Sequence, residues 1–132
     1  MNTAQQLQKK WKATPDEMAQ RLSITRKTAL NWLAGGNPKD VGKMLLYIAA
    51  EENNFDIRRL STETREQYTA TEWIKFLMQK FGDYRLAQFA RRLNLNFATV
   101  SAWNRSKRNR LKGSAEALLL YAHHNPHKFP TR

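Results

Sequence analysis

Residues 19–32, AQRLSITRKTALNW, and residues 90–103, ARRLNLNFATVSAW, follow one pattern at a constant offset of 71 positions. Five positions are identical in the two copies: Ala19/Ala90, Arg21/Arg92, Leu22/Leu93, Thr28/Thr99 and Trp32/Trp103. Apolar character also matches at Ile24/Leu95 and Ala29/Val100. This spacing of apolar side chains suits two helices that cross at a tight turn. The repeat therefore predicts the same two-helix unit twice in one chain.

Helical patterns on both sides extend the first copy. Leu7 and Trp11 lie four residues apart, as on one face of a helix, and Thr14-Pro15 is typical of the start of the next helix. Thr25 is a second expected cap, and the helix that it begins is expected to end before the glycine and proline of residues 35–38. A fourth helix is predicted over about residues 41–52.

The second copy has matching flanks. Thr71 is expected to cap a helix that ends at Gly82. After the turn at residues 94–96, a third helix is expected from residue 97 to about residue 104. The sequence Leu-Leu-Tyr at residues 45–47 recurs at residues 119–121 and predicts an equivalent last helix. The chain is thus predicted to be all-α, with domains at residues 1–52 and 71–125. A linker with a short helical turn near residues 57–60 is expected at 53–70, and an irregular tail at 126–132.

The charge of the chain is strongly positive and unevenly distributed. The 132 residues carry a formal charge of +12. Residues 1–70 hold eleven Lys/Arg against eight Asp/Glu, a net +3, whereas residues 71–132 hold twelve against three, a net +9. This balance favours a polyanionic partner, most strongly for the second half.

Several classes of function find no support in the sequence. The absence of cysteine excludes disulfides and thiolate chemistry, and no apolar run approaches the ~20 residues of a membrane span. His123, His124 and His127 are interpreted as surface residues rather than metal ligands, because no carboxylate or cysteine stands nearby. We expect no enzyme activity, cofactor, small-molecule ligand or membrane contact. The polar N-terminus lacks a signal-peptide core, so a cytoplasmic, nucleoid-associated protein is expected.

The pattern Glu17-Met18-Ala19-x-x-Leu22-x-Ile24-x-x-x-Thr28-Ala29-x-x-Trp32 resembles the helix-turn-helix of the phage repressor and Cro-like superfamily. Residues 31–38 also resemble the Trp-x-x-Gly-x-x-x-Pro ending of that family, with the proline early, and the second copy lacks this ending. The resemblance implies two tandem helix-turn-helix domains of four to five helices each. It also implies that each third helix enters the major groove of DNA.

The resemblance assigns reading positions in the first domain to Thr25, Arg26, Lys27, Thr28, Leu30 and Asn31. Arg26 is expected to pair with guanine and Asn31 with adenine. Lys27 suits either a base or a phosphate, and Thr28 and Thr99 suit a phosphate contact or a cap.

In the second domain the corresponding positions are Asn96, Phe97, Ala98, Thr99, Ser101 and Ala102, which form a less polar surface. Phe97 or Ala98 suits a thymine methyl group, while Asn96 and Ser101 suit hydrogen bonds. Residues 105–112 contain five basic residues in eight and are expected to contact phosphate or the minor groove. These residues are Arg105, Lys107, Arg108, Arg110 and Lys112. A solvated loop is the alternative interpretation of the same run.

The sequence therefore predicts a sequence-specific binder of double-stranded DNA that serves as a transcriptional regulator, a repressor in particular, of a bacterium, phage or mobile element. If both third helices bind successive grooves, they are expected about 34 Å apart. Three alternatives stay open. They are a DNA-architectural or recombination and partition accessory protein, an antitoxin or anti-activator with a protein partner, and a structured-RNA binder. A homodimer also stays open.

Overall fold

The computed structural model describes residues 1–52, 54–59, 69–106 and 111–130. Within these ranges the chain forms eight α-helices, two short 3-10 turns and no strand, so the all-α prediction is confirmed. The first four helices are α1 (Thr3–Trp11), α2 (Pro15–Leu22), α3 (Arg26–Leu33) and α4 (Val41–Glu51), followed by the turn η1 (Ile57–Arg59). The remaining helices are α5 (Ala70–Phe81), α6 (Leu86–Arg92), α7 (Phe97–Asn104) and α8 (Gly113–His124), followed by the turn η3 (Pro126–Lys128).

Side-chain caps begin several of these helices. The Thr14 and Thr25 hydroxyls accept the backbone N–H groups of Glu17 and Thr28, both at 3.1 Å, as the sequence predicts. The cap expected at Thr71 is wrong, because α5 begins at Ala70 and Thr69 caps it. Thr71 lies inside α5, where its hydroxyl donates to the carbonyl oxygen of Asn104 at 2.7 Å and so ties α5 to the end of α7.

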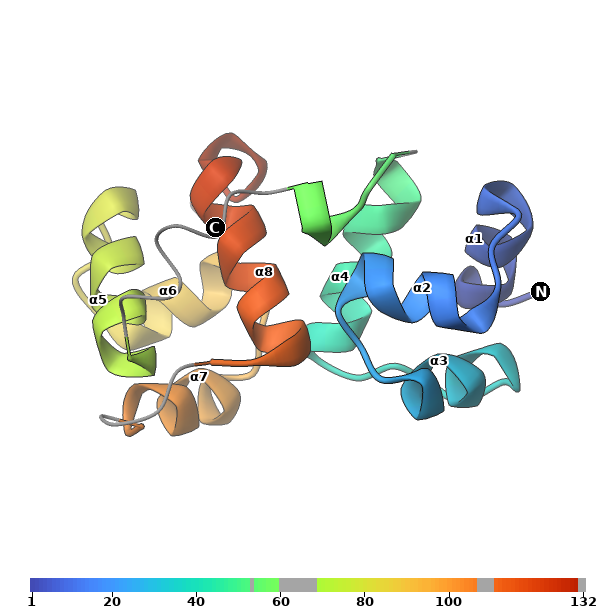
Figure 1. Ribbon diagram of the computed structural model, residues 1–132. Coiled ribbons are helices and arrows are strands. Elements are labelled where there is room, and N and C mark those ends of the chain that lie inside the picture. Colours follow the sequence, from blue (N-terminus) through green and yellow to red (C-terminus); the bar gives the residue numbers. More distant parts are fainter. Residues whose placement is uncertain (53, 60–68, 107–110, 131–132) are drawn as a thin grey trace.

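The helices form two groups that share one core. In Figure 1, α1–α4 lie on one side and α5–α8 on the other, and α4 packs against α8 between them. The buried apolar residues on both sides belong to a single continuous cluster. We call the contact between α4 and α8 the α4–α8 seam. Because the core runs across this seam, the division into two domains stays a prediction from the sequence repeat.

The repeat extends to contacts that one arginine of each copy makes with residues outside the motif. Arg21 lies 3.8 Å over the Trp11 ring and donates from Nε to the Phe55 carbonyl oxygen at 2.9 Å. Its counterpart in the second copy, Arg92, lies 4.8 Å over the Phe81 ring and donates from Nη1 to the Phe129 carbonyl oxygen at 2.8 Å. Each arginine therefore ties the chain beyond the fourth helix of its group back to the first two helices.

The second group adds an ion pair that the first group lacks at the matching site. Arg92 Nε lies 2.8 Å from Asp83 Oδ2, and both side chains are buried. The hydrogen bond from this arginine to Asp83 raises the pKa of Arg92 above its ordinary value, against the opposing effect of burial. The separate bond from Arg92 Nη1 to the Phe129 carbonyl oxygen holds the C-terminal segment, where an irregular tail was expected. Residues 126–128 form η3, and Phe129 is buried.

Candidate nucleic-acid interface

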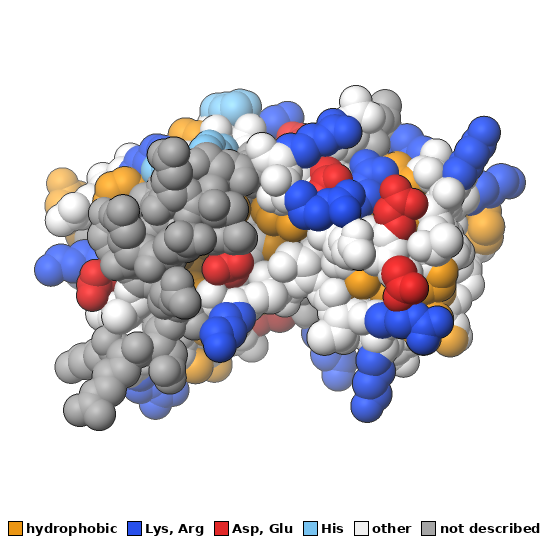
Figure 2. Space-filling view, in the orientation of Figure 1, with side chains coloured by type: hydrophobic (Ala, Val, Ile, Leu, Met, Phe, Trp, Pro, Cys, Tyr) orange, Lys and Arg blue, Asp and Glu red, His pale blue; other side chains and the backbone are white. Residues whose placement is uncertain are grey.

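The two third helices lie on the same edge of the molecule. Figure 1 shows α3 and α7 along the lower edge, each beginning near the α4–α8 seam and running outward from it. Ala29 and Trp32 bury one face of α3, and Val100 buries the matching face of α7. The opposite faces are therefore left toward solvent. Lys and Arg side chains project at this lower edge beneath both groups of helices (Figure 2).

The structure brings the predicted reading residues of the first copy together on the solvent side of α3. Thr25, Arg26, Lys27, Leu30 and Asn31 are exposed, and Thr28 is half-buried. Arg26 Nε lies 2.9 Å from Asp16 Oδ1, with both side chains 65% exposed. Exposed ion pairs of this kind contribute only about 0–1 kcal/mol, so an anionic ligand can displace Asp16 at small cost.

Two of these residues also have structural contacts. The Thr25 hydroxyl accepts the Thr28 N–H in the helix cap and donates to Thr28 Oγ1 at 2.9 Å. Asn31 lies beneath the turn after α3, because a Cβ added at Gly36 would stand 2.6 Å from its Nδ2. The absence of a side chain at Gly36 thus leaves room for the Asn31 amide.

The matching face of α7 is less polar. Asn96, Phe97, Ala98 and Ala102 are exposed, and Thr99 and Ser101 are half-buried. Phe97 keeps 51% of its surface accessible, which is large for an aromatic residue. The Asn96 side chain caps its own helix by accepting the Ala98 N–H at 3.1 Å. The carbonyl oxygen of this amide is therefore already engaged.

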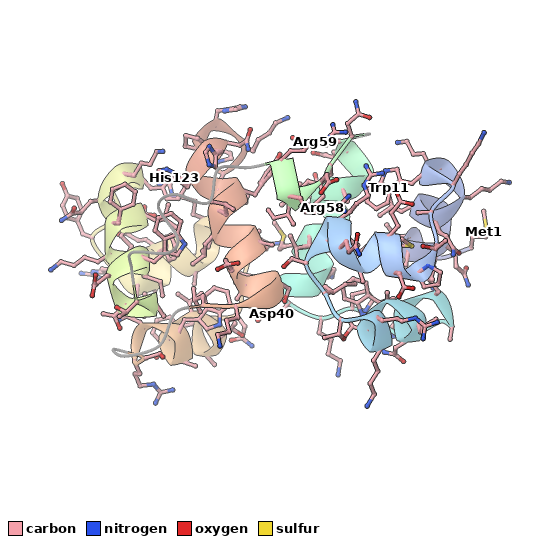
Figure 3. The ribbon with its side chains drawn as sticks, viewed as in Figure 1. Met1, Trp11, Asp40, Arg58, Arg59 and His123 are labelled. Carbon is pink, nitrogen blue, oxygen red and sulfur yellow. The ribbon has the colours of Figure 1, made fainter. Side chains whose placement is uncertain are left out.

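Asp40 is a residue of this edge that the sequence prediction missed. It precedes α4, yet its carboxylate makes no cap bond to that helix. Instead Oδ1 accepts the backbone N–H of Asn96 at 3.0 Å, and Oδ2 accepts the Thr99 hydroxyl. Asp40 therefore occupies the positive N-terminal end of α7. Figure 3 shows it between the two groups of helices near the lower edge.

The beginning of α3 faces the same place without a matching carboxylate contact. A cavity of about 500 Å³ is lined there by Thr25, Thr28, Asp40, Lys112 and Gly113, among others. The start of α3 therefore shares a cavity with the start of α8, and Asp40 joins the same region to the start of α7. Both third helices begin at the lower end of the α4–α8 seam.

The predicted phosphate contacts are only partly described. Arg105 follows α7 and is exposed, and Lys112 is exposed at the start of α8. Lys107, Arg108 and Arg110 lie outside the described residues. The described ends of the basic run thus lie beside α7 and beside the cavity at the start of α3.

The histidines near the C-terminus have unequal environments. His124 and His127 are exposed as expected, but His123 is half-buried, with its ring centroid 5.4 Å from Trp73 and 5.5 Å from Phe76. Burial, followed by the nearby charge of Lys80, lowers the pKa of His123. In the ranges that the structure covers, no group of three or more His, Asp or Glu could hold a metal ion. Nor does any helix in those ranges have the length and apolar character to cross a membrane.

Comparisons of the chain with models of known protein families, with curated proteins and with solved structures found no match. The resemblance to the phage repressor and Cro-like helix-turn-helix therefore rests on the residues of the chain itself. A function can accordingly be inferred only from the geometry of α3, α7 and the α4–α8 seam.

Proposed function

We propose that the protein binds double-stranded DNA sequence-specifically through α3 and α7 and acts as a transcriptional regulator. The observation that carries this proposal is the placement of two exposed third helices on one edge, both beginning at the same seam (Figure 1). A helix of this kind fits the major groove, where the edges of the bases are distinct. Two such helices on one edge can meet one face of a duplex.

The charge of the chain supports a polyanionic partner. The formal charge is +12, and Arg26, Lys27, Arg105 and Lys112 are exposed around α3, around α7 and near the seam. Lysine and arginine contacts to phosphate release counterions, so affinity falls steeply with salt. These contacts orient the protein on the duplex but carry no sequence information. Specificity must come from the exposed faces of the two helices.

The two faces are suited to different bases. On α3, Arg26 is proposed to pair with guanine, and Asn31 with adenine. On α7, Phe97 and Ala98 are proposed to contact thymine methyl groups, and Ser101 to add a hydrogen bond. The bound sequence is therefore expected to have two unlike halves.

The experiment that tests the proposal is selection of binding sites from random duplex DNA with purified full-length protein at about 0.15 M salt, near physiological ionic strength. The expected result is an enriched motif with two separated blocks. Structured RNA is expected to compete poorly with this DNA for the protein. Binding without enrichment that vanishes as salt rises would contradict the proposal and leave phosphate attraction alone. Equal competition by structured RNA would also contradict it.

A further inference from the structure

The carboxylate of Asp40 contacts α7 through two different groups of its first turn. One oxygen accepts the Asn96 backbone N–H at 3.0 Å, and the other accepts the Thr99 hydroxyl. Two bonds to groups three residues apart restrict both the position of the helix and its rotation about its own axis. The negative charge also lies at the end of the helix where the backbone dipoles favour it.

Asp40 is itself held by the group of helices that contains α3. It directly precedes α4, and α4 packs closely on α3, because a Cβ added at Gly42 would lie 2.7 Å from Trp32 Cζ2. The backbone of Asp40 has φ 51° and ψ −112°, a sparsely populated combination that persists only where neighbouring structure enforces it. A chain of contacts therefore leads from Trp32 of α3 through the first turn of α4 and Asp40 to α7.

The other end of the seam is fixed as well. The Tyr121 hydroxyl of α8 donates to Glu52, which follows α4, and the Tyr121 ring packs against Phe55 with centroids 5.7 Å apart. Burial raises the pKa of Tyr121 well above its ordinary value, and the bond to Glu52 adds to this effect, so the hydroxyl stays protonated. Asp40, before α4, is bonded to α7, and Glu52, after α4, is bonded to α8, so the two groups of helices cannot slide past each other without breaking one of these contacts.

We propose that Asp40 is a positioning residue that locks α7 to α3, so that one chain reads one composite DNA site with a single permitted spacing between its halves. This inference rests on the proposed function. Because α3 and α7 both begin at the seam and run outward (Figure 1), the two halves of the site are read in opposite directions along the duplex. The chain thereby does alone what a symmetric dimer does with two copies.

The test measures binding to a series of duplexes in which base pairs are added or removed between the two selected blocks. One base pair changes the separation by about 3.4 Å and the rotation by about 35°. Wild-type protein is expected to lose about tenfold or more in affinity for a change of one base pair, comparable to a mismatch. In Asp40→Ala the affinity for the best spacing is expected to fall, and the loss of affinity at other spacings is expected to be smaller than in the wild-type protein.

Asp40→Asn keeps an oxygen that can accept one of the two bonds, and it is expected to restore part of the spacing preference. Glu51→Ala removes a carboxylate from the opposite, exposed end of α4 and serves as the control, with an unchanged spacing profile. Circular dichroism establishes whether each variant is folded. If Asp40→Ala does not fold, Asp40→Asn replaces it as the test variant.

The outcomes separate this inference from the proposed function. A wild-type spacing profile in Asp40→Ala would overturn the positioning role. Specific binding that tolerates every spacing, or that requires halves in the same direction, would overturn the composite site and leave sequence-specific DNA binding standing. Absence of any selected motif would overturn the proposed function itself.

Discussion

The third helices α3 and α7 share a sequence pattern but differ at their N-terminal ends. At α3 the Thr25 cap opens onto a cavity of about 500 Å³ beside Lys112, and Arg26 and Lys27 are exposed. At α7 the corresponding end is occupied by Asp40, and exposed Phe97 and Ala98 follow. The same motif thus leaves the N-terminal end of α3 without a direct bond to a carboxylate, whereas Asp40 bonds to that of α7.

This difference shows that a repeated local pattern does not give two equal sites. The pattern places apolar side chains against the preceding helix, and it does so in both copies. The N-terminal end of α7 meets Asp40, from the segment before α4, whereas the cavity at the start of α3 is lined by Asp40 together with Lys112 and Gly113. We infer that α3 makes the more polar contacts with DNA. In this proposal α7 adds apolar contacts, and its position relative to α3 is fixed by Asp40.

The largest expected effect distinguishes the two equivalent arginines. Arg92→Ala should reduce the free energy of unfolding by about 3–5 kcal/mol, because it leaves buried Asp83 without its cation. Arg21→Ala removes a bond to a carbonyl oxygen and a contact with the Trp11 ring, for about 1–2 kcal/mol. Urea denaturation of both variants measures the difference. Equal losses would show that the ion pair adds nothing to the second group.

Close packing of α4 on α3 gives the next prediction. Gly42→Ala should destabilise the fold by about 1–3 kcal/mol, because the added Cβ would stand 2.7 Å from Trp32 Cζ2. The helix propensity of alanine acts in the opposite direction by about 1 kcal/mol, so a net loss identifies the clash. Lys43→Ala, at the neighbouring exposed position, is the control for thermal unfolding. A stabilised Gly42→Ala would contradict this packing.

Binding variants compare a base contact with a phosphate contact. Arg26→Ala should cost about 1–3 kcal/mol on the selected site and relax the preference at one base pair. Arg105→Ala should weaken binding to all sequences alike and reduce the slope of log K against log salt by about 1. Titrations of the selected duplex and of variants changed at single base pairs provide both readouts. Equal, sequence-independent losses would refute the two assigned roles.

The smallest expected effect is a dependence of stability on pH. The pKa of His123 is lowered from its ordinary value of 6.5, first by burial and then by Lys80. The unfolded chain therefore takes up a proton first, and stability is complete above pH 6.5 and declines as the pH falls below it. Denaturation at several pH values measures this decline, which His123→Gln should reduce. A decline of the same size in His123→Gln would assign it to other groups.

The sequence was sufficient to predict the all-α class and the helix starts at Thr14 and Thr25, because periodicity and caps are local signals. It placed the cap of α5 two residues too late, since Thr69 and Thr71 are both suitable residues. The sequence prediction also did not identify Phe55 and Phe129 as buried residues of the core. The offset of 74 residues that relates the two Leu-Leu-Tyr segments also relates these phenylalanines, and following it would have found them.

The contact of Asp40 with α7 could not be predicted from local sequence. An aspartate directly before a helix normally indicates a cap for that helix, and the distance from Asp40 to Thr99 along the chain is 59 residues. The bond depends on the packing of α4 against α8, which no local pattern specifies. Similarly, the predicted reading residues identify a surface, but their convergence at the seam is a property of the whole fold.

A hydroxyl-radical footprint of the wild-type protein on its selected duplex, at one chain per duplex, tests most directly whether one chain carries two reading helices. We expect two protected segments on one face of the DNA, separated by one helical turn, ~34 Å. Loss of one protected segment in a variant of α3, and of the other in a variant of α7, would then assign each segment to its helix. A single protected segment, with the second appearing only when another chain binds, would show that one chain does not use two reading helices.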